Sequence, residues 1–273
     1  MTERYELGKP AGKERLLAAL GDQPPRLDLA ALAIATVGDK DLDERESLEK
    51  LEVLAEKVKA HGGEPEGALA AVLGEEDFRG DPDNYDAPEN SMLPLVLKTR
   101  RGLPILLSTV WMEVGRRAGI EVVGVGLPGH FVIGFEHEDG LQLRDPYNGG
   151  KVLTFADCAE IVRKNAGGAT LHPKMLEPVE TAPIAWRMLN NLKGSYARRN
   201  DDSHTLEVLD LMLTLSPDHP LQLLHRAELL TGLGAFSAAL KDIEKCKTLE
   251  SFPDPSRLER IAAQLKERIG ELH

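Results

Sequence analysis

The spacing of apolar residues changes along the chain, and these changes predict its elements. Between residues 26 and 60 a short apolar segment is followed by a stretch whose apolar side chains recur every three or four positions. The stripe in that stretch consists of Leu48, Leu51, Leu54 and Val58. Such a spacing is typical of an amphipathic helix that packs one face on a core. We therefore expect two helices in this region.

Two further helices are predicted at 92–101 and 103–119. Ser91 is expected to cap the first helix, and Gly102 to end it by adopting the left-handed conformation. The second helix has Pro104 at its second position, which suits a first helical turn. Its apolar residues cover a broad face, which indicates a central helix with other elements packed around it.

After Gly119 the pattern changes from helical to strand-like. Strands are predicted at 120–127, 130–136 and 141–146, and the first two are rich in β-branched residues. The segment 137–140 contains an Asp-Gly pair, which is the signal of a tight hairpin turn. A helix followed by an antiparallel meander predicts an α+β fold.

From about Pro183 the chain is helical again, and its pattern recurs after 34 residues. The equivalent pairs are Tyr196 and Leu230, Thr205 and Ala239, Leu209 and Ile243, and Met212 and Cys246. A period of 34 resembles the tetratricopeptide repeat, and 256–269 has the pattern of a capping helix. Fewer than three full repeats are visible, so an arbitrary helical bundle stays open as the alternative.

Composition and charge narrow the class of protein. Of the 273 residues 42% are hydrophobic and 29% are charged, and the formal net charge is −12. This acidic balance argues against a general nucleic-acid surface. No run of about 18 apolar residues is present, and the charged N-terminal stretch lacks the apolar core of a signal peptide. We expect a cytoplasmic protein without a membrane segment.

The chain shows no spacing of metal ligands. Its two cysteines, Cys158 and Cys246, lie far apart and outside any zinc motif, so both are expected to be free thiols. The acidic loop 80–91 lacks the glycine and the terminal glutamate that a calcium loop requires. No metal and no cofactor is therefore expected.

The same acidic loop contains polar residues that are candidates for binding. Asn84, Tyr85 and Asn90 are expected to hold the loop through bonds from side chain to backbone. In that conformation the loop would border a cleft, so the three residues are also candidate binding residues.

Two residues in the strand region have the chemistry of a catalytic dyad. His130 lies on the second predicted strand and Asp145 ends the third. Directly opposed residues on antiparallel strands approach each other closely, so we expect a hydrogen bond between the ring and the carboxylate. A histidine held by an aspartate serves as a general base, but a buried His–Asp pair is also a common structural device.

Several segments together resemble one known family, the SirB-type transglutaminase-like proteins with C-terminal tetratricopeptide repeats. The segments that carry the resemblance are LAALAIA, DNYDAPENS, RGLPILLS, GLPGHFV and DPYNGG. The resemblance implies an α+β, papain-like or transglutaminase-like core, with a central helix on an antiparallel sheet, and an α-helical C-terminal domain. The implied divisions are an N-terminal helical segment at 1–80, the core at 81–175 and the repeat domain at 176–273.

The resemblance also implies a catalytic triad, and this chain departs from it. A cysteine should begin the central helix, His130 should act as the base and Asp145 should orient it. Pro104 stands where the thiol is expected. Ser108 follows one helical turn later and is a candidate nucleophile in the wrong register, while Cys158 would have to fold back across the site.

Two functions are therefore weighed from the sequence. The preferred one is a degenerate, non-catalytic protein that binds another protein or a peptide, or acts as a regulatory factor, through its cleft and its repeat-like helices. The alternative is a hydrolase or peptidase that uses His130 and Asp145 without a cysteine. The candidate binding residues are Asn84, Tyr85, Asn90, Pro104 and Tyr147.

Overall fold

A group of helices forms the N-terminal part of the molecule. The computed structural model describes residues 12–249 and 254–271. The two helices predicted between residues 26 and 60 are present as the second and third of this group. Its members are α1 (Lys13–Gly21), α2 (Leu27–Ala35), α3 (Glu44–His61), α4 (Pro65–Glu75), a 3-10 turn (Pro88–Ser91) and α5 (Leu93–Thr99).

Helix α6 (Pro104–Ala118) is the centre of the largest core. Its residues are buried on nearly every side through the first twelve positions, which confirms the prediction of a central helix. Polar contacts fix it to α2, because Glu113 accepts a hydrogen bond from the backbone N–H of Asp28 and Arg117 pairs with both carboxylates. Gly119, at φ 79°, ends the helix in the left-handed conformation.

The residues predicted to cap and to end α5 are wrong. Ser91 does not cap the helix, because Met92 occupies the capping position and the Ser91 hydroxyl is buried without a partner. The left-handed residue at the end of α5 is Arg100, at φ 60°, whose guanidinium is held by Glu76. Gly102 is needed for close packing, since a Cβ there would lie 2.9 Å from the Val96 side chain.

The strands form one antiparallel sheet in the order β1-β2-β3-β4. A two-residue turn between His137 and Gly140 joins the second and third strands, as the Asp-Gly pair predicts. The first strand is shorter than predicted at both ends, with Gly126 directly after it, and the fourth was not predicted. The strands are β1 (Val123–Val125), β2 (Val132–His137), β3 (Gly140–Asp145) and β4 (Lys151–Leu153).

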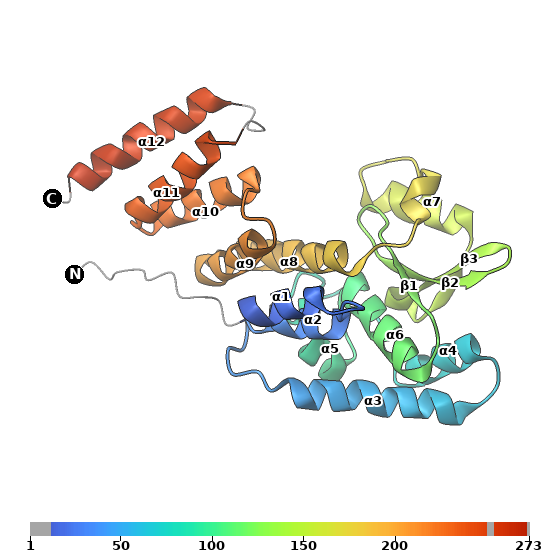
Figure 1. Cartoon of the computed structure of the whole chain (residues 1–273). Coiled ribbons are helices and arrows are strands. Elements are labelled where there is room, and N and C mark those ends of the chain that lie inside the picture. The colour runs from blue at the N-terminus through green and yellow to red at the C-terminus, as the bar shows by residue number, and fades with distance from the viewer. Residues whose placement is uncertain (1–11, 250–253, 272–273) are drawn as a thin grey trace.

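Both faces of the sheet are covered, as Figure 1 shows. Phe131, Ile133 and Phe135 belong to the core built around α6, whereas Val132 and Leu143 belong to a second core beneath α7 (Phe155–Asn165). This burial on both faces explains why the β2 segment is a continuous apolar run. Short 3-10 turns follow β3 (Pro146–Asn148) and α7 (Pro173–Leu176).

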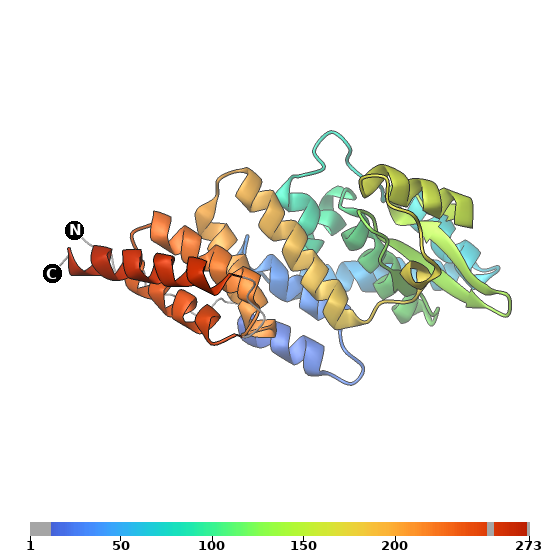
Figure 2. The same ribbon diagram turned by 90° about the horizontal axis from the view of Figure 1, so that it is seen from above.

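The C-terminal helices repeat with the predicted period. Arg198 ends α8 and Gly232 ends α10, while Asp202 begins α9 and Phe236 begins α11, so both pairs of helix ends are 34 residues apart. Figure 2 shows the resulting elongated molecule, with the sheet at one end and α12 at the other. The helices are α8 (Thr181–Arg198), α9 (Asp202–Leu215), α10 (Pro220–Gly232), α11 (Phe236–Lys247) and α12 (Pro255–Gly270).

Helix α8 joins the two parts of the molecule. Its apolar face, which includes Ile184, Met188 and Leu192, is buried in the core around α6, while α10 to α12 enclose a separate core. The sequence-based division at 175/176 stays a prediction. None of the helices in the described parts of the chain combines the length and the apolar character that crossing a membrane requires.

Candidate functional site

His130 and Asp145 meet at the end of the sheet. His130 lies just before β2 and Asp145 is the last residue of β3, and the pairing of these two strands brings them together. Nε2 of the ring lies 3.0 Å from Oδ2 of the carboxylate. Both side chains are buried, with 8% and 1% of their surface exposed. The predicted hydrogen bond is therefore present, and it leaves Nδ1 as the ring nitrogen that can face a ligand.

Asp145 has two further hydrogen-bond donors. The Tyr147 backbone N–H donates to Oδ1 at 3.0 Å, and the Asn148 amide donates to Oδ2 at 2.7 Å. Burial alone would raise the pKa of Asp145, but the bonds from His130 and Asn148 outweigh it and lower that pKa below its ordinary value. The carboxylate is therefore ionised at neutral pH and fixes the orientation of the ring.

A line of aromatic rings extends from the dyad to the acidic loop. The Tyr147 ring meets the His130 ring edge to face, with centroids 5.9 Å apart, and Tyr85 meets Tyr147 in the same way. Tyr147 fits because Gly80 has no side chain, since a Cβ there would lie 2.2 Å from its ring. Burial raises the pKa of both phenols, so they are neutral donors near pH 7.

The acidic loop is fixed by its amide side chains. The Asn84 amide donates to Asp81, and the buried Asn90 amide donates to the Asn84 carbonyl at 2.8 Å. The Asn90 carbonyl in turn accepts from the N–H of Leu103, which precedes α6. Asn84 and Asn90 thus hold the loop against the central helix, whereas Tyr85 contacts its neighbour through its ring.

The candidate nucleophiles are not hydrogen-bonded to His130. Pro104 begins α6 and is buried, and the Ser108 hydroxyl, one turn later, is fully buried without a hydrogen-bond partner. Cys158 lies in the core beneath α7, where burial raises the pKa of its thiol to about 11. Within the described residues, no hydroxyl or thiol is hydrogen-bonded to His130. That the start of α6 faces Nδ1 stays a prediction.

A cavity of about 760 Å³ opens beside the dyad, and we call it the acidic-loop cavity. It is lined by Asp77, Arg79, Asp81, Arg101, Tyr147 and Asn148 among others. Tyr147 is the only sequence-predicted binding residue in its lining, because Asn84, Tyr85, Asn90 and Pro104 lie outside it. Since Asn148 also bonds to Asp145, the cavity is one residue away from the dyad.

Two residues of the site were missed by sequence reasoning. Asn148 follows Asp145 by three positions, within the DPYNGG segment, and that proximity could have indicated it. Arg187 on α8 donates from Nη2 to the carbonyls of Leu127 and His130, at 2.8 and 2.5 Å. Because Arg187 lies 57 residues from His130, no local pattern announces the contact.

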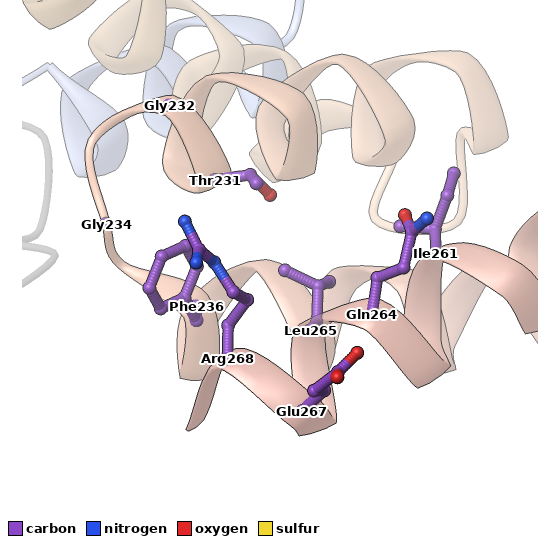
Figure 3. Close-up of a pocket in the computed structure, with 9 residues that line it drawn as sticks. All are labelled: Thr231, Gly232, Gly234, Phe236, Ile261, Gln264, Leu265, Glu267 and Arg268. Atoms are coloured by element: carbon purple, nitrogen blue, oxygen red, sulfur yellow. The ribbon is translucent and has the colours of Figure 1, made fainter. Parts of the chain in front are cut away.

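A second pocket, of about 460 Å³, lies between the α10–α11 turn and α12. Phe236 and Leu265 give it an apolar floor, and the Arg268 guanidinium stacks over the Phe236 ring at 5.7 Å from its centroid. Figure 3 shows these side chains side by side, with Thr231 on the opposite wall. This pocket belongs to the C-terminal helices alone and contains no residue of the dyad.

Comparisons with known proteins agree with this architecture. Residues 45–190 match the model of the transglutaminase-like superfamily, and residues 192–266 match a tetratricopeptide repeat. A UPF0162 protein of Xylella fastidiosa is 32% identical over 198 residues, which are 71% of this chain and 70% of that protein. A UPF0162 protein of Pseudomonas aeruginosa is 28% identical over 267 residues, or 95% and 96% of the two chains.

A eukaryotic protein is also similar. The F-box only protein 21 of Mus musculus is 27% identical over 196 residues, which are 66% of this chain and 30% of that protein. No solved structure matches the chain significantly. The superfamily match covers more than half of the chain and the relatives extend it into the repeats. The chain therefore belongs to the transglutaminase-like superfamily, within the UPF0162 proteins, with tetratricopeptide repeats at its C-terminal end.

Proposed function

We propose that this protein is a non-catalytic member of its superfamily. It acts as a cytoplasmic protein-binding or regulatory factor through the acidic-loop cavity and its repeat helices. The observation that carries the proposal is that, in the described part of the chain, no hydroxyl or thiol is hydrogen-bonded to His130. Pro104 has no nucleophilic atom, and Ser108 and Cys158 are enclosed in two different cores. The intact His130–Asp145 pair then serves to brace the sheet end.

The C-terminal helices support a role in binding. Tetratricopeptide repeats generally mediate contacts between proteins, and their stacked helices provide extended binding surfaces. The net charge of −12 argues against a nucleic-acid partner. A protein or a peptide is therefore the partner that the composition and the repeats favour.

One observation favours a second candidate, a hydrolase that needs no cysteine. The His130–Asp145 pair has the geometry of a base with its orienting carboxylate, and Nδ1 has no hydrogen-bond partner within the described residues. A water molecule activated at Nδ1 would replace the missing thiol. This candidate requires turnover that depends on His130.

Hydrolysis assays separate the two candidates. The full chain and its His130→Ala variant are assayed with fluorogenic ester, amide and peptide substrates. The proposal expects no turnover above the buffer rate by either protein. Hydrolysis by the wild type that disappears in a folded His130→Ala variant would establish the hydrolase instead.

Binding is tested separately by selecting a random-peptide phage library on the full chain. The proposal expects a consensus peptide whose measured affinity falls in variants of the acidic-loop cavity or of the repeat helices. Asp139→Asn in the exposed hairpin turn is the matched control and should bind as the wild type does. A library that yields no consensus, or a consensus whose binding no such variant weakens, contradicts the binding role.

A further inference from the structure

Arg187 is a half-buried cation whose charge has no carboxylate partner among the described residues. It lies on α8, and its bonds go to two backbone carbonyls and, through its charge, to the Phe131 ring at 5.4 Å. The half-buried Arg226 and the less exposed Arg117 differ, because each is paired with two carboxylates. A desolvated guanidinium without an anion is unfavourable, and burial accordingly lowers the pKa of Arg187.

The guanidinium retains hydrogen-bonding capacity. Both of its hydrogen bonds start from Nη2, so Nε and Nη1 have no acceptor within the described residues. Neither nitrogen is fully buried in the protein. Both are therefore available to a group that approaches from the solvent, and a guanidinium binds a carboxylate best through two such N–H groups.

Two neighbouring side chains also have polar atoms without a partner among the described residues: the Tyr85 hydroxyl can donate, whereas the free nitrogen of the His130 ring accepts because the other nitrogen donates to the ionised Asp145. The His130 ring has Nε2 engaged by Asp145, and Nδ1 has no partner within the described residues. Tyr85 is 42% exposed. Burial raises the pKa of its phenol, and the positive charge of the nearby Arg187 opposes this rise. These three residues, Arg187, Tyr85 and His130, form what we call the Arg187 cluster.

The charges around the cluster select the class of anion. Arg187 contributes one unpaired positive charge, while Asp81 and Asp83 of the loop that carries Tyr85 are negative and oppose a doubly charged group. The planar fork of a guanidinium matches a carboxylate. The exposed Tyr85 ring offers a flat apolar surface to the chain that follows such a group.

We propose that the Arg187 cluster binds a carboxylate group of a peptide, with Arg187 supplying the charge and Tyr85 an additional hydrogen bond, beside the His130 ring. This inference rests on the proposed binding function and adds to it a site outside the lining of the acidic-loop cavity. The carboxylate has two sources, the C-terminus of a peptide and an aspartate side chain within one. Both present the same chemistry to the cluster.

The experiment uses the full chain labelled with 15N at its histidine rings and follows the His130 ring signals by NMR. The probes are N-acetyl-triglycine, its C-terminal amide, an amidated N-acetyl-Gly-Asp-Gly peptide and inorganic phosphate. We expect the first and third probes to shift the His130 signals, and the amide to leave them unchanged. A larger response to the first or to the third probe identifies the source of the carboxylate.

Variants separate binding from structure. Arg187→Gln should lower the affinity for the carboxylate probes by about 10-fold or more, because a charge-assisted bidentate pair is lost. Arg163→Gln is the control, since it removes an exposed positive charge from α7 that pairs with Glu160, and it should bind as the wild type does. Arg187→Lys keeps the charge and should retain part of the affinity if Arg187→Gln fails to fold.

Defined results overturn the inference. Equal responses to the acid and its amide, tighter binding of phosphate than of either acid, or an Arg187→Gln variant that binds like the wild type would each refute it. Cleavage of a peptide probe would instead refute the proposed non-catalytic function, whatever the affinity. No cleavage together with no carboxylate binding removes the inference and leaves the proposed function standing.

Discussion

Replacing Asp145 by asparagine tests whether the His130–Asp145 pair braces the fold. The carboxylate is 1% exposed and accepts three hydrogen bonds. Oδ2 accepts from both His130 and Asn148, and Oδ1 accepts from the Tyr147 N–H. The substitution keeps the size of the side chain and removes its charge and one of its two acceptor atoms.

The magnitude follows from those three contacts. If the new amide nitrogen takes the place of Oδ1, it faces the Tyr147 N–H; if it takes the place of Oδ2, it faces Asn148 even when the His130 ring changes tautomer. The first arrangement leaves the part-buried Tyr147 N–H without its acceptor, which costs about 1–3 kcal/mol, whereas the second costs less because the exposed Asn148 amide can turn to solvent. With the lost charge, Asp145→Asn should reduce the free energy of unfolding by roughly 3 kcal/mol at pH 7.

The pH dependence has a definite sign. Because the folded-state pKa of Asp145 is lowered, its contribution is complete above the unfolded pKa, about 3.9, and is lost as the pH falls through the folded value. The gap between wild type and Asp145→Asn should therefore narrow below about pH 4. Urea unfolding at pH 7 and in steps toward pH 3, followed by circular dichroism and tryptophan fluorescence, measures this gap.

The control is Asp83→Asn, which changes an exposed carboxylate of the acidic loop and should alter the stability little at any pH. An Asp145→Asn variant as stable as the wild type at pH 7 would refute the bracing role. A stability gap of the same size at pH 7 and pH 3 would refute the ionic part of the argument.

Three other substitutions probe the surroundings of the dyad and the core of the C-terminal helices. Pro104→Cys should give a thiol whose rate of alkylation by iodoacetamide is half-maximal at a pH below the ordinary cysteine pKa of about 8.5. Adding His130→Ala should return that pH to the ordinary value. An unreactive thiol would contradict the placing of Pro104 at the nucleophile position. Arg226→Met leaves the buried Asp242 and the half-buried Asp210 unpaired and should cost about 3–5 kcal/mol. Unchanged hydrogen exchange in α10 would refute this. Gly80→Ala should displace the Tyr147 ring and destabilise the protein by about 1–3 kcal/mol, as thermal unfolding would reveal.

The elements that the sequence predicted well have local causes. Helix α6 begins at a proline and ends at a glycine, and both act within one turn. The β2–β3 hairpin follows from its Asp-Gly pair in the same way. The end of α5 was misplaced because the residue that adopts φ 60° there, Arg100, is held by the distant Glu76, which no local propensity reveals.

The site was predictable to the extent that the hairpin sets its geometry. His130 and Asp145 meet because two adjacent strands pair, so their spacing was informative. Ser108 was misleading, because helical spacing gives its position on α6 but not the packing that buries its hydroxyl. Arg187 reaches His130 only through the docking of α8 on the first core, and such a contact depends on tertiary structure alone.

The packing of α8 also links the transglutaminase-like part of the chain to its repeats. The superfamily match ends at residue 190 and the repeat match begins at 192, yet α8 runs through both without a break. Its N-terminal half carries Arg187 to the dyad, and Arg198 at its C-terminal end pairs with Asp86 of the acidic loop. Because α10 to α12 have a core of their own, a lesion such as Arg226→Met should loosen those helices first. The cluster around Arg187 should survive such a lesion for as long as α8 stays packed on α6, since its contacts come from the first core.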